Sequence, residues 1–103
     1  MTKNEILDKL KQFKPLFSKE GIVLLGLFGS YANNSANENS DIDILVETTP
    51  KFLEKYRGFK AFTKLDEFKE LLSIEFNKNI DLVDKQGLLQ HKNLHILDKT
   101  IYV

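Results

Sequence analysis

The chain has 103 residues, the length of one domain, and 42% hydrophobic and 29% charged residues, which is typical of a folded globular protein. Fifteen basic residues balance fifteen acidic ones, so strong generic binding to nucleic acid is not expected. The absence of cysteine excludes disulfides and thiolate metal sites, and no apolar stretch is long enough to cross a membrane, so we expect one cytoplasmic domain spanning 1–103.

A first helix is expected close to the N-terminus. Thr2 followed by Glu5 has the spacing of a capping box, in which the two residues cap the same helix end. Apolar residues then recur along one helical face: Ile6, Leu10, Phe13 and Phe17. Pro15 lies inside this pattern, so we expect the helix to end near Phe13 or to kink.

Two strands separated by a polar loop are expected next. Residues 22–28 form a continuous apolar run that predicts a strand buried on both faces, with Gly29 and Ser30 directly after it. Residues 33–40 have the composition of a loop. Residues 41–46 alternate as a strand does, so Asp41 and Asp43 share one face.

The second half of the chain predicts helices around a third strand. Residues 51–57 are ambiguous between helix and loop. Residues 59–76 carry apolar side chains three and four apart, which indicates a helix that packs on the core: Phe59, Phe62, Leu65, Phe68, Leu72 and Phe76. A short strand at 80–83, a helix at 87–97 and an extended piece at 100–103 follow. The order predicts an α/β (α+β) fold with a small mixed β-sheet flanked by helices.

Three aspartates are the candidate catalytic and metal-binding residues. Asp41 and Asp43 point the same way, with Cα atoms ~6.5 Å apart, and unpaired acids beside apolar residues favour a bound cation. Asp81 lies in a similar setting on the expected third strand. If the strands are neighbours, the three carboxylates converge and can hold two Mg²⁺ ions, a two-metal site suited to in-line phosphoryl transfer.

The Gly29-Ser30 turn is the candidate phosphate-binding element. Glycine lets the backbone approach a ligand closely. Ser30 is expected to cap the helix that follows, and free N–H groups at a helix start attract phosphate. The chain lacks the GxxxxGK[ST] pattern of the P-loop, so the proposed triphosphate site is of another kind.

These segments resemble the minimal nucleotidyltransferases of the polymerase-β-like superfamily. The resemblance rests on residues 29–32 and 40–47, on the Ile-Asp-Leu-Val strand at 80–83 and on the tail from Leu94 to Tyr102, and it covers almost the whole chain. It implies the polymerase-β-like fold. It also implies that Gly29, Ser30, Asp41 and Asp43 bind the nucleotide, that Asp41, Asp43 and Asp81 bind Mg²⁺, and that Asp81 helps to activate the acceptor hydroxyl.

The resemblance further implies a partner and a reaction. Members of this size look like antitoxins of toxin–antitoxin pairs, whose partner is a small helical HEPN-family ribonuclease toxin. The expected reaction is Mg²⁺-dependent transfer of AMP from ATP to a tyrosine hydroxyl of that toxin. The chain departs from the family at Asn33 and Asn34, where Arg-Gly is common. A weak or inactive antitoxin that neutralises its HEPN partner by binding alone is therefore the alternative.

Several competing interpretations are kept beside this one. A solvent-facing strand could carry Asp41 and Asp43 without function, and Asp84 is a rival to Asp81 but is better explained as a helix cap. His91 and His95 are four apart, yet no HExxH glutamate lies between them, so a surface role is favoured. Transfer to a small molecule or to RNA is less favoured, because the chain has little room for a substrate domain and no net positive charge.

Overall fold

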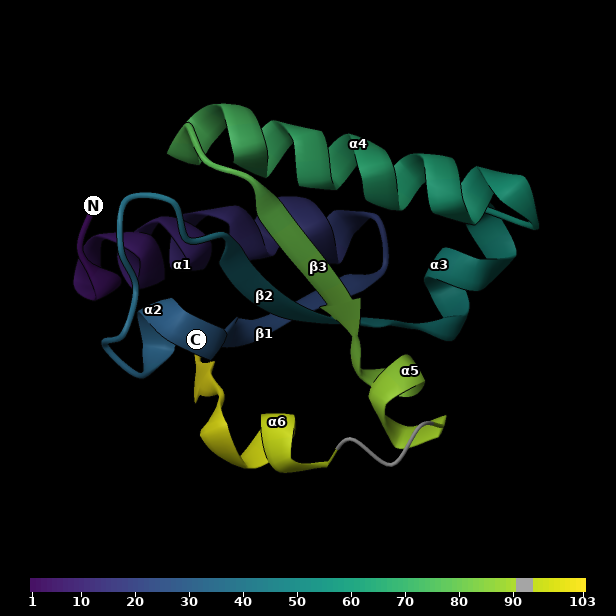
Figure 1. The fold of residues 1–103 in the computed structure, drawn as a ribbon. Coiled ribbons are helices and arrows are strands. Elements are labelled where there is room, and N and C mark those ends of the chain that lie inside the picture. The colour runs from purple at the N-terminus through teal and green to yellow at the C-terminus, as the bar shows by residue number, and fades with distance from the viewer. Residues whose placement is uncertain (91–93) are drawn as a thin grey trace.

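The computed structural model describes residues 1–90 and 94–103. Its elements, in chain order, are α1 Lys3–Lys19, β1 Ile22–Phe28, α2 Gly29–Ala32, β2 Ile42–Thr48, α3 Pro50–Lys55, α4 Phe59–Phe76, β3 Ile80–Asp84, α5 Lys85–Gln90, α6 His95–Lys99 and β4 Ile101–Tyr102. Figure 1 shows α4 along one side of the sheet and α5 and α6 along the other. No helix in these two described ranges is long and apolar enough to cross a membrane.

The four strands form one mixed sheet in the order β3-β2-β1-β4. β1 pairs antiparallel with β2 and with β4, whereas β2 and β3 run parallel and are connected through α3 and α4. A register shift between Leu24 and Gly26 interrupts the β1–β2 pairing. A Cβ on Gly26 would lie 2.9 Å from the carbonyl carbon of Ile101, so this glycine allows β4 to approach β1 closely. The expected α/β fold with a small mixed sheet is confirmed.

The two faces of the sheet are covered unequally. One face presents Ile42, Ile44 and Val46 to α1 and α4, and together they form the main core. The other face has a small second cluster around Phe28, Leu45 and Leu88, against which parts of α5 and α6 pack. Because successive residues of a strand alternate between faces, Asp43 lies on the second face, with Leu45. The candidate acids therefore belong to the less covered face.

The N-terminal helix confirms one expectation and corrects another. Thr2 and Glu5 form the predicted capping box, in which the Glu5 N–H donates to Thr2 Oγ1 over 3.2 Å. The expected helix end near Phe13 is wrong, because α1 continues through Pro15 to Lys19. Proline removes only the hydrogen bond to the carbonyl of Lys11, an exposed residue whose carbonyl water can reach. Burial of Leu10 and Phe17 on either side holds the helix together.

The long helix α4 forms as expected, but its first two turns do not pack on the core. Phe68, Leu72 and Phe76 are buried, whereas Phe59 and Phe62 are 89% and 70% exposed. The interpretation of the whole phenylalanine pattern as core is therefore wrong for these two residues. A 3.6-residue period identifies one face of a helix, but it does not show how far along the axis the underlying sheet extends.

Three smaller boundaries also differ from expectation. The ambiguous segment 51–57 contains α3, which is capped at its start by the hydroxyl of Thr49. Strand β2 begins at Ile42, so Asp41 precedes it. The expected helix 87–97 is replaced by α5 and α6, and residues 91–93, within its span, lie outside the described residues.

Candidate active site

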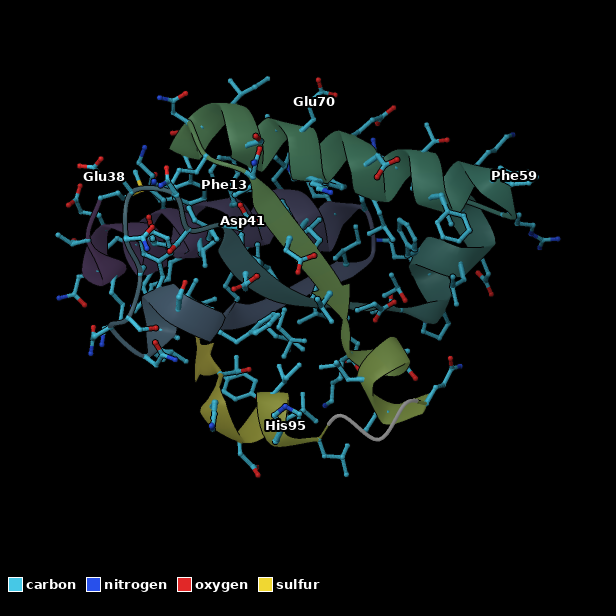
Figure 2. All side chains as sticks on the ribbon, in the orientation of Figure 1. Phe13, Glu38, Asp41, Phe59, Glu70 and His95 are labelled. Carbon is cyan, nitrogen blue, oxygen red and sulfur yellow. The ribbon has the colours of Figure 1, made fainter. Side chains whose placement is uncertain are left out.

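The register of two neighbouring strands brings the predicted acids together. Asp43 on β2 is paired directly with Asp81 on the parallel strand β3. Side chains of paired residues in a sheet lie on the same face, so the two carboxylates are adjacent. Asp41 lies two residues earlier, directly before β2, where Figure 2 places it beside the first part of β3. The condition that β2 and β3 are neighbours is therefore met.

The electrostatics of Asp43 reflect this crowding. Asp43 is partly buried, whereas Asp41 and Asp81 are exposed. Burial, followed by the charges of Asp81 and Asp41 and a hydrogen bond with Asp81, raises the pKa of Asp43 to about 6. A carboxylate crowded by two other acids is stabilised by a bound cation, and a perturbed acid of this kind is typical of functional sites.

Gly29 lies directly against the carboxylate of Asp43. Its backbone has φ +74°, in the left-handed region that favours glycine. A Cβ at this position would lie 2.9 Å from Asp43 Cγ and would overlap the carboxylate oxygen Oδ2. Glycine is therefore required here both by the backbone conformation and by the closeness of the acid.

Ser30 does not have the capping role expected from the sequence. The short helix α2 begins at Gly29, its N-cap is Phe28, and no side chain caps it. Ser30 is the second residue of the helix and is partly exposed. The carbonyls of Gly29 and Ser30 accept from the N–H groups of Asn33 and Ser35 over 3.1 and 2.9 Å, so the N–H groups of the first turn point the opposite way.

The loop after α2 is closed by the two asparagines that depart from the family pattern. The Asn33 side-chain oxygen accepts from the backbone N–H of Ser35 over 3.0 Å and also from the Ser35 hydroxyl. Asn34 has φ +65°, the left-handed conformation expected of a residue that replaces glycine. The turn is preserved, and the Asn33 side chain is engaged within it.

A cavity of about 440 Å³ opens beside Gly29, between α2 and α6. It is lined by Phe28, Gly29, Ala32, Asn33, His95, Ile96 and Lys99. The proximity of α6 to Gly29 is not predictable from the sequence, because the nearest of these α6 residues is more than 60 positions from Gly29 and no local pattern links them. The antiparallel return of β4 along β1 brings α6 to this place.

A polar groove of about 600 Å³ lies on the other side of the acids, between β3 and α4. Asp41 and Asp81 line it together with side chains of α4, among them Asp66, Lys69 and Glu70. These α4 residues are also absent from the sequence prediction, because on a helix they have the pattern of an ordinary solvated face. This groove therefore gives access to Asp41 and Asp81, whereas the cavity between α2 and α6 borders Gly29.

Asp84 and the histidines, which the sequence offered as alternatives to the candidate acids, are not part of the acid cluster as far as the structure describes them. Asp84 accepts from the Thr48 hydroxyl over 2.7 Å and from the N–H of Gln86 over 3.1 Å, so it joins β2 to the start of α5, in agreement with its interpretation as a cap. His95 is exposed on α6 (Figure 2). His91 lies outside the described residues.

The donor atoms suit a hard divalent cation. Within residues 1–90 and 94–103, no three acidic or histidine side chains are gathered tightly enough to enclose an ion by themselves. Asp43 and Asp81, with Asp41 at their edge, instead offer an open set of carboxylate oxygens. Mg²⁺ characteristically takes one or two carboxylates and completes its shell with water and substrate phosphates. The residues present therefore fit Mg²⁺ bound together with a nucleotide.

Comparisons with known proteins agree with this arrangement. A family model described as "Nucleotidyltransferase domain" matches residues 3–103. "Protein adenylyltransferase MntA" of Thermococcus cleftensis is 33% identical over 87% of this chain and 83% of its own length. A Methanocaldococcus jannaschii protein named a "putative protein adenylyltransferase" is 40% identical over 84% of this chain and 82% of its own.

A solved structure shows the same fold. It is described as "putative minimal nucleotidyltransferase" and matches with a TM-score of 0.74, covering 100% of this chain and 97% of the solved chain at 24% identity. The match extends over the sheet and the helices that flank it, as the resemblance noted in the sequence implies. The family match over residues 3–103, together with the relatives that are 33% and 40% identical, shows that the chain belongs to the nucleotidyltransferase domain family.

Proposed function

We propose that this protein is a Mg²⁺-dependent adenylyltransferase that moves AMP from ATP onto a hydroxyl of a partner protein. The observation that carries the proposal is the pairing of Asp43 with Asp81 on adjacent strands, with Gly29 in contact with the same carboxylate. In this arrangement the carboxylates, which favour a bound cation, lie next to a backbone turn whose N–H groups can bind phosphate. The names of the relatives support adenylyl transfer to protein.

The reaction can be described through the residues of this chain. Gly29 and Ser30 would hold the phosphates with their N–H groups, and Asp41, Asp43 and Asp81 would hold Mg²⁺, which offsets phosphate charge in the transition state. The acceptor oxygen attacks the α-phosphorus in line, and the bond to the bridging oxygen breaks, so that pyrophosphate leaves. Asp81, which is exposed at the groove, would take the proton of the acceptor hydroxyl.

The acceptor that we propose is a tyrosine of a HEPN-family ribonuclease toxin, which this chain would silence as an antitoxin. The family resemblance in residues 29–47 and 80–102 is the basis for that choice. The cytoplasm, where ATP and Mg²⁺ are both available, is the expected setting. We further propose that residues 1–103 act as a single domain.

The test is incubation of the chain with a HEPN-family toxin from the same genome, Mg²⁺ and ATP labelled on the α-phosphate. Label should appear on the toxin, and toxin ribonuclease activity should fall in parallel. Asp43→Asn should abolish labelling, because it removes the carboxylate at the centre of the cluster. Equal labelling by wild type and by this variant would overturn the proposal.

A second candidate function is neutralisation by binding alone. The observation in its favour is that the Asn33 side chain bonds to Ser35 within its own loop and so offers no cation to a phosphate. Under this alternative, the combined variant Asp41→Asn, Asp43→Asn and Asp81→Asn would suppress the toxin as fully as the wild type. Loss of suppression in this variant, with binding retained, would establish the enzyme.

A further inference from the structure

A large apolar surface is exposed where α3 meets α4. Phe59 is 89% exposed, Phe62 70% and Leu53 53%. We call these three residues, together with the hollow that Leu53 and Phe62 help to line, the corner surface. The hollow measures about 700 Å³ and is lined mainly by apolar side chains, including Phe52, Tyr56, Ala61 and Leu65. Figure 2 shows Phe59 at the end of α4 next to α3, away from Asp41.

The corner surface belongs to a well-anchored part of the molecule. Phe52 is fully buried, and its ring packs against Tyr56 with centroids 5.2 Å apart. The Tyr56 hydroxyl and Lys55 Nζ both donate to Glu20, which follows α1, with the lysine contact at 2.8 Å. These contacts fix α3 to the rest of the fold, so the exposed rings stand on a fixed support. Contiguous apolar patches of this kind mark interaction sites.

The segment that carries the corner surface is predominantly basic, although Glu54 and Asp84 also line the hollow beside Arg57. Residues 50–64 contain five basic residues and a single acid, in a chain whose charges balance overall. Lys55 and Lys64 form ion pairs with Glu20 and Glu67. The other three, Lys51, Arg57 and Lys60, are exposed and form no ion pair with any described residue. A partner that covers this surface should therefore present carboxylates at its rim.

The shape favours a helical partner segment. The corner lies mainly between helices, and the edge strand β3 contributes only its last residue, Asp84, to the hollow, so little strand edge is open to pairing with a partner strand. Recognition must therefore depend on side chains entering the hollow. An amphipathic helix, which satisfies its own backbone and offers apolar residues at i, i+3 and i+4, matches such a groove.

We propose that the corner surface docks the acceptor protein of the adenylyl transfer through an amphipathic helix with acidic flanks. This inference depends on the proposed function. Asp84 lines the hollow and lies three residues beyond Asp81 on the edge strand β3, ~10 Å along the strand and on the opposite face of the sheet. Docking there would hold the acceptor near the β3 edge of the sheet, and a separate segment of it would pass along the groove between β3 and α4 to bring the hydroxyl to Asp81. Such tethering raises the local concentration of the hydroxyl.

A second copy of this chain is the less favoured occupant. The far half of α4 also exposes apolar residues between acids, with Ile74 at 75% and Leu71 at 39% exposure. Contact between that stretch and the corner surface of another copy would be head-to-tail, which forms rings or open filaments instead of a closed dimer. Single-stranded RNA could also use exposed rings and basic side chains. The test described next distinguishes both of these occupants from the acceptor protein.

The test uses the HEPN-family toxin as acceptor and the double variant Phe59→Ser/Phe62→Ser. These side chains are exposed, so the variant should fold, which circular dichroism checks. Calorimetry should show at least tenfold weaker binding to the toxin, and the KM for the toxin should rise as much, with kcat and the KM for ATP unchanged. The combined charge reversal Arg57→Glu/Lys60→Glu should weaken binding in a salt-dependent way. Ile74→Ser, on the same helix, is the matched control and should behave as wild type.

Three results would overturn the docking proposal. The first is wild-type affinity of Phe59→Ser/Phe62→Ser for the toxin. The second is concentration-dependent self-association of the wild type that this variant abolishes, and the third is binding of a fluorescent single-stranded RNA that it abolishes. To distinguish failure of the docking proposal from failure of the proposed enzymatic function, the calorimetry is repeated with the variant that combines Asp41→Asn, Asp43→Asn and Asp81→Asn. Docking that persists there and is lost on adding the two Ser substitutions supports the corner surface, whatever happens to label transfer.

Discussion

The α-carbon of Gly29 faces the carboxylate of Asp43, and no methyl group fits between them. The contact joins the end of β1 to β2, because Phe28 and Asp43 are register partners in the antiparallel pair. The proposed phosphate-binding turn and the central acid are therefore in direct contact, and glycine is required at position 29 both by the closeness of the acid and by its φ of +74°.

Gly29→Ala should impair the site more than it impairs the fold. The new Cβ must displace the Asp43 carboxylate, and alanine is strained at positive φ by about 1–2 kcal/mol. We expect the free energy of unfolding to fall by roughly that amount, and Mg²⁺-dependent ATP binding to fall by at least about tenfold. Chemical denaturation and calorimetry measure the two effects.

Gly87→Ala is the matched control for this substitution. Gly87 lies in α5 with open space around its α-carbon and without a positive φ, so alanine should be neutral or stabilising by up to about 1 kcal/mol. Equal loss of ATP binding in both variants would show that the contact between Gly29 and Asp43 is unimportant.

Asp43→Asn should raise the stability of the protein while it removes activity. Burial and two neighbouring acids disfavour the ionised carboxylate, which is why its pKa is about 6 against an ordinary value of 3.8. Discounted for partial exposure, the relief amounts to about 1 kcal/mol at pH 7. Thermal unfolding without divalent cations should show the gain, and 10 mM Mg²⁺ with ATP should reverse the order of the two proteins. A less stable Asn variant would contradict the electrostatic account.

The raised pKa of Asp43 also determines how the stability of the protein changes with pH. At pH 7 Asp43 is ionised in the folded and the unfolded chain, and the folded chain bears the repulsion. Between about pH 6 and 3.8 the folded chain takes up a proton that the unfolded chain does not, so the contribution of Asp43 becomes more favourable as pH falls. The stability advantage of Asp43→Asn should therefore shrink from pH 7 to pH 5.

Protons and Mg²⁺ should compete at Asp43. At pH 5, one unit below its pKa, only about a tenth of the carboxylates are ionised, so Mg²⁺ affinity should be about tenfold weaker than at pH 7.5. Calorimetric titration of the protein with MgCl₂ at the two pH values measures this. In Asp43→Asn, which lacks the titrating group, the difference should largely disappear, and an unchanged difference would place the titration at another residue.

The acid cluster could be predicted from the sequence because it depends on local rules. Alternation along a strand puts Asp41 and Asp43 on one face, and an apolar run identifies the strand that carries Asp81. The sequence did not predict that β2 and β3 are neighbours. That pairing depends on the path of the chain through α3 and α4, which makes β3 parallel to β2. The turn at Asn34 was also predictable, because left-handed conformations favour a small set of residues.

The remaining errors have a common origin in tertiary structure. Phe59 and Phe62 match the apolar period of α4, yet no part of the sheet lies beneath them to bury them. Pro15 is tolerated because burial of Leu10 and Phe17 outweighs one missing hydrogen bond. The approach of α6 to Gly29 depends on how β4 pairs with β1. A strand of two residues is too short for its pairing to be predicted from the sequence.

Asp81 and Asp84, three residues apart on β3, should separate catalysis from stability. Asp84 accepts hydrogen bonds from Thr48 and Gln86, so Asp84→Ala should lower the free energy of unfolding by about 1–2 kcal/mol while Mg²⁺-dependent ATP binding is kept. Asp81 is exposed and adds to the repulsion at Asp43, so Asp81→Asn should leave stability unchanged or slightly higher and should reduce label transfer by at least about a hundredfold. Denaturation curves should therefore show a loss of stability only for Asp84→Ala, and transfer rates should show the large loss of activity for Asp81→Asn. If Asp84→Ala lost transfer while Asp81→Asn retained it, the third acid of the site would be Asp84, and the register pairing of Asp43 with Asp81 would have no catalytic meaning.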